Sequence, residues 1–258
     1  MELAEGGRLT DLLTRFGRLP EVNVRFYAAQ IFIALSFLHE QNILHRDLKL
    51  DNVLLDGAGF IRLCDFGLSV DGFQDDGLVN SPCGTFVYVA PEVFRNSYGK
   101  AADWWSYGVL LYLMATGRLP FGGKNIKELF VAITRREPFY DSFLSSALVS
   151  LLKRLLSKSA RDRPGYKSSG DKRPLAADPF FAGVDWLRLQ THSMTPPPLP
   201  KRRLQTSRPS ENLSSAASHA FLSASFPAAQ SLSSPLQRDW QSKTTRSGSL
   251  SMTGLPAV

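Results

Sequence analysis

Cysteine is scarce in this sequence, and so are segments that would carry the chain into or across a membrane. Only Cys64 and Cys83 occur in 258 residues, which excludes a disulfide framework and favours a reducing compartment. The N-terminus, MELAE, lacks the basic and apolar regions of a signal peptide. The longest apolar run, residues 109–115, is well short of the about 20 residues that span a bilayer. We therefore expect a cytoplasmic protein, with the nucleus as a second location, and no transmembrane segment.

Clustered charge is also missing. The net charge of +7 is spread along the chain and does not form the basic patch of a nucleic-acid-binding protein, so we expect no nucleic-acid partner. Apolar residues make up 43% of the chain, as in an ordinary globular domain. Near residue 190, however, Ser, Pro and basic residues become dominant. Residues 205–258 are predicted to be a disordered Ser/Pro-rich tail that is dispensable for folding.

Residues 45–52, HRDLKLDN, concentrate the chemistry that the chain does contain. Asp47 can accept a proton, Lys49 can face a phosphate, and Asn52 can hold a divalent metal. A second carboxylate, Asp65, follows in the sequence CDFG. Phosphoryl transfer needs such a set, because one group orients the attacking hydroxyl while cations neutralise charge on the transferring phosphoryl group. The alternative, a surface loop of solvated charges, does not explain the ordered motifs that follow.

Three further motifs appear in a fixed order: DFG at residues 65–67, APE at 90–92 and DWWS at 103–106. Together with HRDLKLDN, they resemble the large lobe of a eukaryotic protein kinase. Finer details resemble the AGC group of serine/threonine kinases: MELAEGG, RFYAAQI, DLKLDN, CGT, DWWSYG, and PFF with DW before a proline-rich segment. The resemblance covers residues 1–204.

This resemblance implies a mainly α (α+β) fold, a kinase-like large lobe with short β-hairpins followed by a disordered tail. Its domains would be a large lobe at 1–189 that starts at the hinge, an AGC-type tail segment with P-x-x-P at 190–204, and the tail 205–258. Hydrophobic periodicity independently predicts helices and one hairpin. The predicted helices are residues 9–16, 20–41, 103–116, 124–134 and 145–157, and the predicted strands are 53–55 and 61–63. Residues 68–89 are predicted to be a mobile loop.

The resemblance assigns roles in catalysis. Asp47 would be the base that orients the substrate hydroxyl, Lys49 would neutralise the γ-phosphate of ATP, and Thr85 would bond both of them. Asn52 and Asp65 would hold Mg²⁺. The position of Lys49, third after Arg46, matches serine/threonine kinases and not tyrosine kinases.

The resemblance also assigns nucleotide contacts and structural roles. Leu54 would lie under the adenine, backbone groups of Leu3 would meet its edge, and Glu5 would reach the ribose. Asp103 would brace the catalytic loop. Glu92 and Arg163 would form a buried ion pair, for which we favour a purely structural role.

The same resemblance also implies how the protein would be regulated and which substrates it would choose. Ser81 falls where the family carries its activating phosphate, which an upstream kinase would add, and Arg46 is the nearest expected cation. The substrates would be proteins. Asp51 keeps an acidic position that favours basic residues around the target Ser or Thr. Arg8 and Val131, in contrast, stand where strongly basophilic members have acidic residues.

The sequence also departs from the family pattern. No G-x-G-x-x-G loop and no V-A-I-K strand occur before the hinge-like segment, and both belong to the small lobe in the family. Phe86 and Val87 follow CGT, where the family has Pro-Glu. The first hypothesis is therefore a serine/threonine kinase large lobe, of doubtful activity as the chain alone. The alternative is a non-catalytic kinase-lobe scaffold or pseudokinase-like binding module.

Two weaker signals have competing interpretations. Residues 197–202, PPLPKR, match an SH3 ligand, but we favour a segment that lies against the large lobe, as in the AGC tail. Cys83 could be a redox switch if its pKa were lowered, but we favour an inert thiol.

Overall fold

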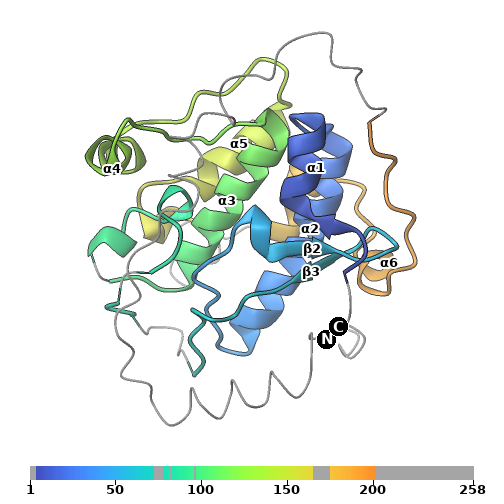
Figure 1. Cartoon of the computed structure of the whole chain (residues 1–258), viewed down its shortest axis with the longest axis horizontal. Helices are drawn as coiled ribbons and strands as arrows, with labels where there is room; N and C mark the ends of the chain where they lie inside the picture. Colours follow the sequence, from blue (N-terminus) through green and yellow to red (C-terminus); the bar gives the residue numbers. More distant parts are fainter. Residues whose placement is uncertain (1–3, 73–77, 82, 96, 165–174, 201–258) are drawn as a thin grey trace.

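Helices are the main regular elements of the described structure, and a small sheet packs against one side of them (Figure 1). The computed structural model describes residues 4–72, 78–81, 83–95, 97–164 and 175–200. This confirms the mainly helical α+β fold class with short strands. Leu3, the tail 205–258 and part of the predicted mobile loop lie outside the described residues.

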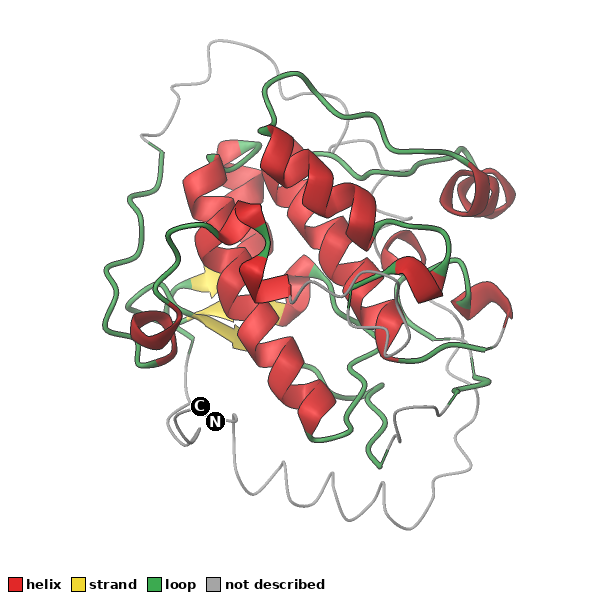
Figure 2. Ribbon diagram, turned by 180° about the vertical axis from the view of Figure 1, so that it is seen from behind, coloured by secondary structure: helices red, strands yellow, loops and turns green. Residues whose placement is uncertain are grey.

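The helix α2 (Glu21–Glu40) buries most of its residues and leads to the catalytic-loop motif. Seen from behind, the helices lie in front of the strands (Figure 2). Pro20 precedes its first turn with φ −56°, because proline fixes the dihedral that a helix start requires. By length and composition alone α2 could span a membrane, and it is the one such helix among the described residues. However, 67% of its apolar window is buried inside the fold. The core of the lobe therefore accounts for its hydrophobicity.

The helix α3 (Lys100–Thr116) is the most deeply buried helix of the described residues. It begins three residues before the predicted start at Asp103, directly after Gly99, which stands at its N-cap in an extended conformation. It ends as predicted at Gly117, which adopts φ +75°. A Cβ at Gly117 would lie 2.1 Å from the carbonyl oxygen of Gly17, so only glycine lets the two turns approach this closely.

Three antiparallel strands form the sheet in the order β1-β2-β3. The predicted hairpin is confirmed as β2 (Val53–Leu55) and β3 (Ile61–Leu63), with Val53 opposite Leu63. Asp56 closes its turn, since Oδ1 accepts hydrogen bonds from the backbone amides of Ala58 at 3.0 Å and Phe60 at 2.9 Å. The strand β1 (Gly7–Arg8) was not predicted. It leads directly into α1 (Leu9–Phe16), which matches its prediction.

The remaining helices lie around this core. The predictions for α4 (Ile126–Arg135) and α5 (Ser146–Leu155) are correct to within two residues, with Asn125 and Ser145 as N-caps. The short helix α6 (Trp186–Gln190) was not predicted. Within the predicted mobile loop, Phe86–Tyr88 instead form a buried 3₁₀ turn.

The proline-rich segment lies against the lobe, as expected for a tether. The side-chain amide of Asn23, in the first turns of α2, donates to the carbonyl oxygens of Pro197 at 3.2 Å and Pro198 at 3.3 Å. The ring of His192 stacks on Phe60, with 4.3 Å between centroids. These contacts hold the segment across the outside of α2 and the end of the hairpin.

Candidate active site

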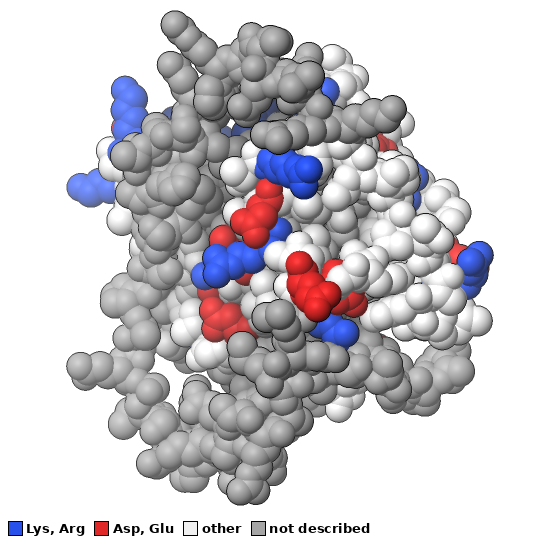
Figure 3. Space-filling model, turned by 45° about the vertical axis from the view of Figure 1, so that its right-hand side comes forward, with Lys and Arg blue, Asp and Glu red and all other residues white. Residues whose placement is uncertain are grey.

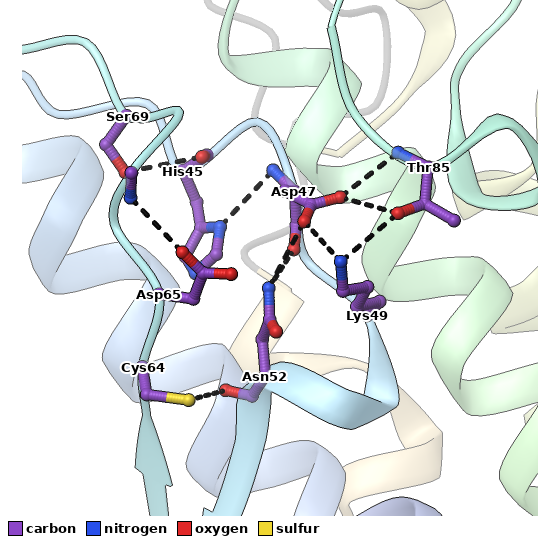
Figure 4. A network of polar contacts seen from close by, with 9 residues as sticks. His45, Asp47, Lys49, Asn52, Cys64, Asp65, Ser69 and Thr85 are labelled. Carbon is purple, nitrogen blue, oxygen red and sulfur yellow. Dashed lines mark hydrogen bonds and ion pairs between the residues drawn. The ribbon is translucent and has the colours of Figure 1, made fainter. Parts of the chain in front are cut away.

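The loop between α2 and β2 brings the predicted polar side chains together around one carboxylate (Figure 4). The Asp47 side chain is only 8% exposed. Its Oδ1 accepts hydrogen bonds from the Thr85 hydroxyl at 2.9 Å and the Thr85 amide at 3.1 Å. Its Oδ2 accepts from Lys49 Nζ at 2.6 Å and from Asn52 Nδ2 at 3.3 Å. Lys49 Nζ also reaches the Thr85 hydroxyl at 3.3 Å, so three donor side chains fix the orientation of Asp47.

Asp103 braces the backbone of this loop from α3. Its two carboxylate oxygens accept the amide of Arg46 at 2.9 Å and the amide of His45 at 3.0 Å. Arg46 has φ +68°, a left-handed conformation that is unfavourable for a long side chain, so these bonds hold a strained turn in place. Burial alone would raise the pKa of Asp103. However, the hydrogen bond between His39 Nε2 and Asp103 Oδ2, at 2.9 Å, and the charge of that ring lower the pKa on balance. Asp103 is therefore ionised and strongly hydrogen-bonded.

His45 is buried and supports the loop without carrying a charge. Its Nδ1 accepts the amide hydrogen of Asp47 at 3.3 Å, so the proton of the neutral ring lies on Nε2. Burial lowers the pKa of His45 despite the three carboxylates nearby. The ring lies 5.2 Å from that of Phe66, which joins the catalytic loop to the DFG motif.

The hairpin places Asn52 and Asp65 at its open end. Since Val53 pairs with Leu63, Asn52 and Cys64 are the next neighbours, and the Cys64 amide donates to the Asn52 carbonyl at 3.0 Å. Both hydrogen bonds of the Asn52 side chain use Nδ2, an arrangement that leaves Oδ1 facing away from Asp47. Asp65 is exposed, adopts φ +61°, and accepts the Gly67 amide at 3.4 Å.

These two groups fit magnesium. Among the described residues, no cluster of three or more His, Cys, Asp and Glu side chains could hold a metal. Mg²⁺ differs from zinc in that it takes oxygen ligands, with one or two carboxylates from the protein and the rest from water and substrate phosphates. One amide oxygen and one exposed carboxylate at the same edge therefore suit Mg²⁺ together with a phosphate substrate.

The structure describes two of the three residues predicted to contact the adenine or the ribose, Leu54 and Glu5. Leu54 is half-buried in β2, opposite Arg8 on one side and Arg62 on the other. Glu5 is exposed, and its carboxylate lies beside the hairpin turn, where a Cβ on Gly57 would be 3.0 Å from Oε2. Leu3 lies outside the described residues.

Tyr98 links the segment between the DFG and APE motifs, here called the activation segment, to the catalytic loop, a role that sequence reasoning missed. Its hydroxyl donates to the carbonyl oxygen of Ser81 at 2.7 Å and accepts from Arg46 at 3.5 Å. The thiol of Cys83 lies 3.4 Å from the same hydroxyl. Burial raises the pKa of Cys83, which favours an inert thiol. No local pattern marks Tyr98, because its importance comes entirely from residues distant in sequence.

The predicted ion pair between Glu92 and Arg163 is confirmed. The guanidinium forms two parallel hydrogen bonds with the carboxylate, and the Arg163 side chain is 0% exposed.

Comparisons with known proteins agree with this geometry. A family model, the protein kinase domain, matches residues 1–173. The chain is 40% identical over 217 residues to protein kinase C-like 1B of Caenorhabditis elegans, which covers 83% of this chain and 30% of that protein. It is 41% identical over 202 residues to protein kinase C eta type of Rattus norvegicus, covering 78% of this chain and 30% of the relative. It is also 37% identical over 214 residues to protein kinase C epsilon type of Oryctolagus cuniculus, covering 82% and 29%.

The chain thus spans about 30% of the length of these relatives. The order of its motifs, its helical lobe and these identities lead to one assignment: the chain belongs to the protein kinase domain family, within the AGC group of serine/threonine kinases.

Proposed function

We propose that this chain supplies the catalytic loop of a serine/threonine kinase that transfers the γ-phosphate of ATP to serine or threonine side chains of proteins. The observation that carries the proposal is the fixed orientation of Asp47 by Lys49, Asn52 and Thr85. A surface carboxylate has no need of three such partners, whereas a catalytic base must be held within hydrogen-bond reach of its proton.

The proposal gives each of these side chains a role that its position supports. Asp47 accepts the hydrogen bond of the substrate hydroxyl and orients its oxygen toward the phosphorus atom. Lys49, only 2.6 Å from Asp47, places a positive charge where the transferring phosphoryl group accumulates negative charge. Thr85, in the activation segment, hydrogen-bonds to both side chains and keeps them next to each other. Asn52 and Asp65 would hold Mg²⁺, which neutralises charge on the ATP phosphates.

ATP would lie along the hairpin, with Leu54 under the adenine, the backbone of Leu3 at its edge and Glu5 at the ribose. The proposal for Leu54 rests on its half-buried place in the central strand, close to the catalytic loop. Glu5 would have to turn away from the hairpin turn at Gly57 to reach a ribose.

Regulation would act through Ser81. An upstream kinase would phosphorylate it, and the added charge, about −1.5 to −2, would attract Arg46. The Tyr98 hydroxyl already connects the two residues, because it donates to the Ser81 carbonyl and accepts from Arg46. The substrates would be proteins with basic residues around the target, a preference that Asp51 favours and Arg8 weakens, and the chain would act in the cytoplasm or the nucleus. The face shown in Figure 3 carries acidic and basic side chains interspersed, with no continuous basic patch in view.

Phosphoryl transfer to a basic serine peptide tests the proposal. The assay uses ATP and Mg²⁺ with the 258-residue chain, and with the longest natural polypeptide that contains it. In the active form, Asp47→Asn is expected to lower kcat by about 10²–10⁴-fold, the usual contribution of a positioned base. Asp185→Asn is the matched control, because Asp185 is an exposed N-cap at which Asn serves equally well.

Equal activity of Asp47→Asn and the control would refute a catalytic role for Asp47. If neither polypeptide transfers phosphate, but both bind protein substrates, the alternative of a non-catalytic kinase-lobe scaffold is favoured.

A further inference from the structure

The proline-rich segment at residues 195–200, TPPPLP, runs along the outside of the molecule and has no helix or strand of its own (Figure 1). Proline fixes its own φ at about −65° and restricts the residue before it to extended conformations. Four of these six residues are proline, and Thr195 and Leu199 each precede one. The segment is therefore biased toward a polyproline II helix, so a partner that binds this conformation has little ordering entropy to overcome.

The lobe holds the segment through few polar contacts. In the part of the chain that the structure describes, its hydrogen bonds to the lobe come from one group, Asn23 Nδ2, which donates to the carbonyls of Pro197 at 3.2 Å and Pro198 at 3.3 Å. Asn23 is 0% exposed, and its Oδ1 has no hydrogen-bond partner among the described residues. A buried acceptor without a donor destabilises the docked state, which favours displacement of the segment by a partner.

The prolines that face the lobe are also the ones that a partner would read. A polyproline II helix has about three residues per turn, so Pro197 and Pro200 lie on one edge of it. Both are half-buried here, and Pro196 packs near the hairpin turn, where a Cβ on Gly59 would lie 3.4 Å from the proline Cγ. Leu199, in contrast, is 39% exposed. A groove that takes the edge of Pro197 and Pro200 must therefore remove the segment from the lobe.

Basic residues follow the prolines directly. Residues 201–203 are KRR, so the complete pattern is P-x-x-P-x-R. We propose that residues 197–202 bind an SH3 domain whose aromatic groove has carboxylates at its rim, and that this binding excludes docking of the segment on the lobe. Pro197 and Pro200 would occupy the aromatic groove, and Arg202 would pair with the carboxylates.

This exclusion has a measurable consequence. Because the lobe covers the binding edge, only molecules with a released segment can bind, and the apparent dissociation constant rises accordingly. Asn23→Asp keeps the size of the side chain but replaces the donor with a carboxylate that faces two carbonyl oxygens. Asn23 is the third residue of α2, where a carboxylate suits the helix dipole. The substitution should therefore release the segment and leave the helix intact.

Binding of the 258-residue chain to an array of purified SH3 domains tests the proposal, with an array of purified WW domains for comparison. The test variants are Pro197→Ala and Arg202→Glu. Pro198→Ala is the matched control, because it also removes one proline from the segment but keeps Pro197 and Pro200. Lys127→Glu, an exposed charge on α4, is the control for the change of charge.

We expect SH3 domains with an acidic groove to bind the wild-type chain. Pro197→Ala and Arg202→Glu should each weaken this binding by about tenfold or more, as at interface hot spots, while Pro198→Ala and Lys127→Glu match the wild type. Asn23→Asp should tighten it by about two- to tenfold, the effect of losing the hydrogen bonds that hold the segment.

A synthetic peptide of residues 195–203 gives a second measurement of the same effect. The peptide has no lobe attached to it and needs no fold, so it should bind the SH3 domain more tightly than the chain does. The comparison of peptide and chain keeps the proposal testable if Asn23→Asp unfolds.

Three outcomes would overturn the proposal. The first is that no SH3 domain of the array binds the chain or that only WW domains do. The second is equal binding by Pro197→Ala and Pro198→Ala. The third is equal SH3 affinity of the wild-type chain, Asn23→Asp and the peptide, because the lobe and the SH3 domain would then not compete for the segment.

Discussion

The buried ion pair between Glu92 and Arg163 is expected to be the most sensitive single point in the fold. Arg163 joins the segment after α5 to the APE motif more than 70 positions earlier. Besides the two bonds to Glu92, its guanidinium donates to the carbonyls of Ser157 at 2.8 Å and Ala101 at 2.9 Å. Its Cζ also lies over the ring of Trp105, 5.0 Å from the centroid. Arg163→Met keeps much of the volume but removes every one of these donors.

The expected loss of stability is large because the partners remain buried. The Glu92 side chain is only 13% exposed, so Arg163→Met leaves a carboxylate and two carbonyls without their donor. Removal of one partner of a buried ion pair costs about 3–5 kcal/mol, compared with a total stability of about 5–15 kcal/mol for typical domains. At about 2–4 °C per kcal/mol for a chain of this size, the melting temperature should fall by about 6–20 °C.

Urea unfolding followed by tryptophan fluorescence measures the effect, since Trp105 lies directly against the guanidinium. The control is Arg118→Met, which breaks an ion pair whose arginine is 41% exposed and should cost at most about 1 kcal/mol. The double variant Glu92→Gln/Arg163→Met should lose less than the sum of its single variants, by about 1–3 kcal/mol. A loss below about 1 kcal/mol for Arg163→Met would refute the reasoning.

Four further predictions concern the site and the core. Asp103→Asn gives up one acceptor for the catalytic-loop amides and should cost about 1–3 kcal/mol in urea unfolding; an unchanged midpoint would contradict this. Burial lowers the pKa of Lys158 to about 8, so between about pH 8 and 10 the unfolded chain holds a proton that the folded chain has released. Stability should therefore rise with pH in that window, and Lys158→Met should remove the rise; identical pH profiles would count against it. Phosphosite mapping should find phosphate on Ser81, and modification of Thr85 alone would be the opposite result. The 258-residue chain by itself should be a poor kinase, at least about 10²-fold below a form that adds a glycine-rich loop and its lysine; robust transfer that Asp47→Asn abolishes would show otherwise.

The parts of the fold that were predictable depend on local chemistry. Pro20 and Glu21 indicate the start of α2, and Gly117 indicates the end of α3, because each residue favours one backbone conformation. The hairpin was predictable for the same reason, since Asp56 and Gly57 mark its turn. In each case the physical cause lies within a few residues of the feature.

The errors occur where the cause is distant in sequence. The strand β1 has only two residues and exists because Gly7 and Arg8 pair with β2, which no alternation in the sequence indicates. The start of α3 at Lys100 was missed for a different, local reason, since glycine is only modestly enriched at N-caps. In the site, the loop HRDLKLDN was visible as chemistry, but the contacts of Thr85 and Asp103 came from family resemblance. Tyr98 was indicated neither by the chemistry of a local motif nor by the family resemblance.

The loop between α4 and α5 shows most clearly why sequence alone stops short of predicting which apolar side chains are exposed. Phe139 and Phe143 are four residues apart, a spacing that in a helix would predict burial. The structure instead places them in a loop with the rings exposed, and the guanidinium of Arg18, 125 positions earlier, lies 3.9 Å from the centroid of Phe143. Burial can therefore be assigned only once the α1–α2 turn and the end of α3 are in place.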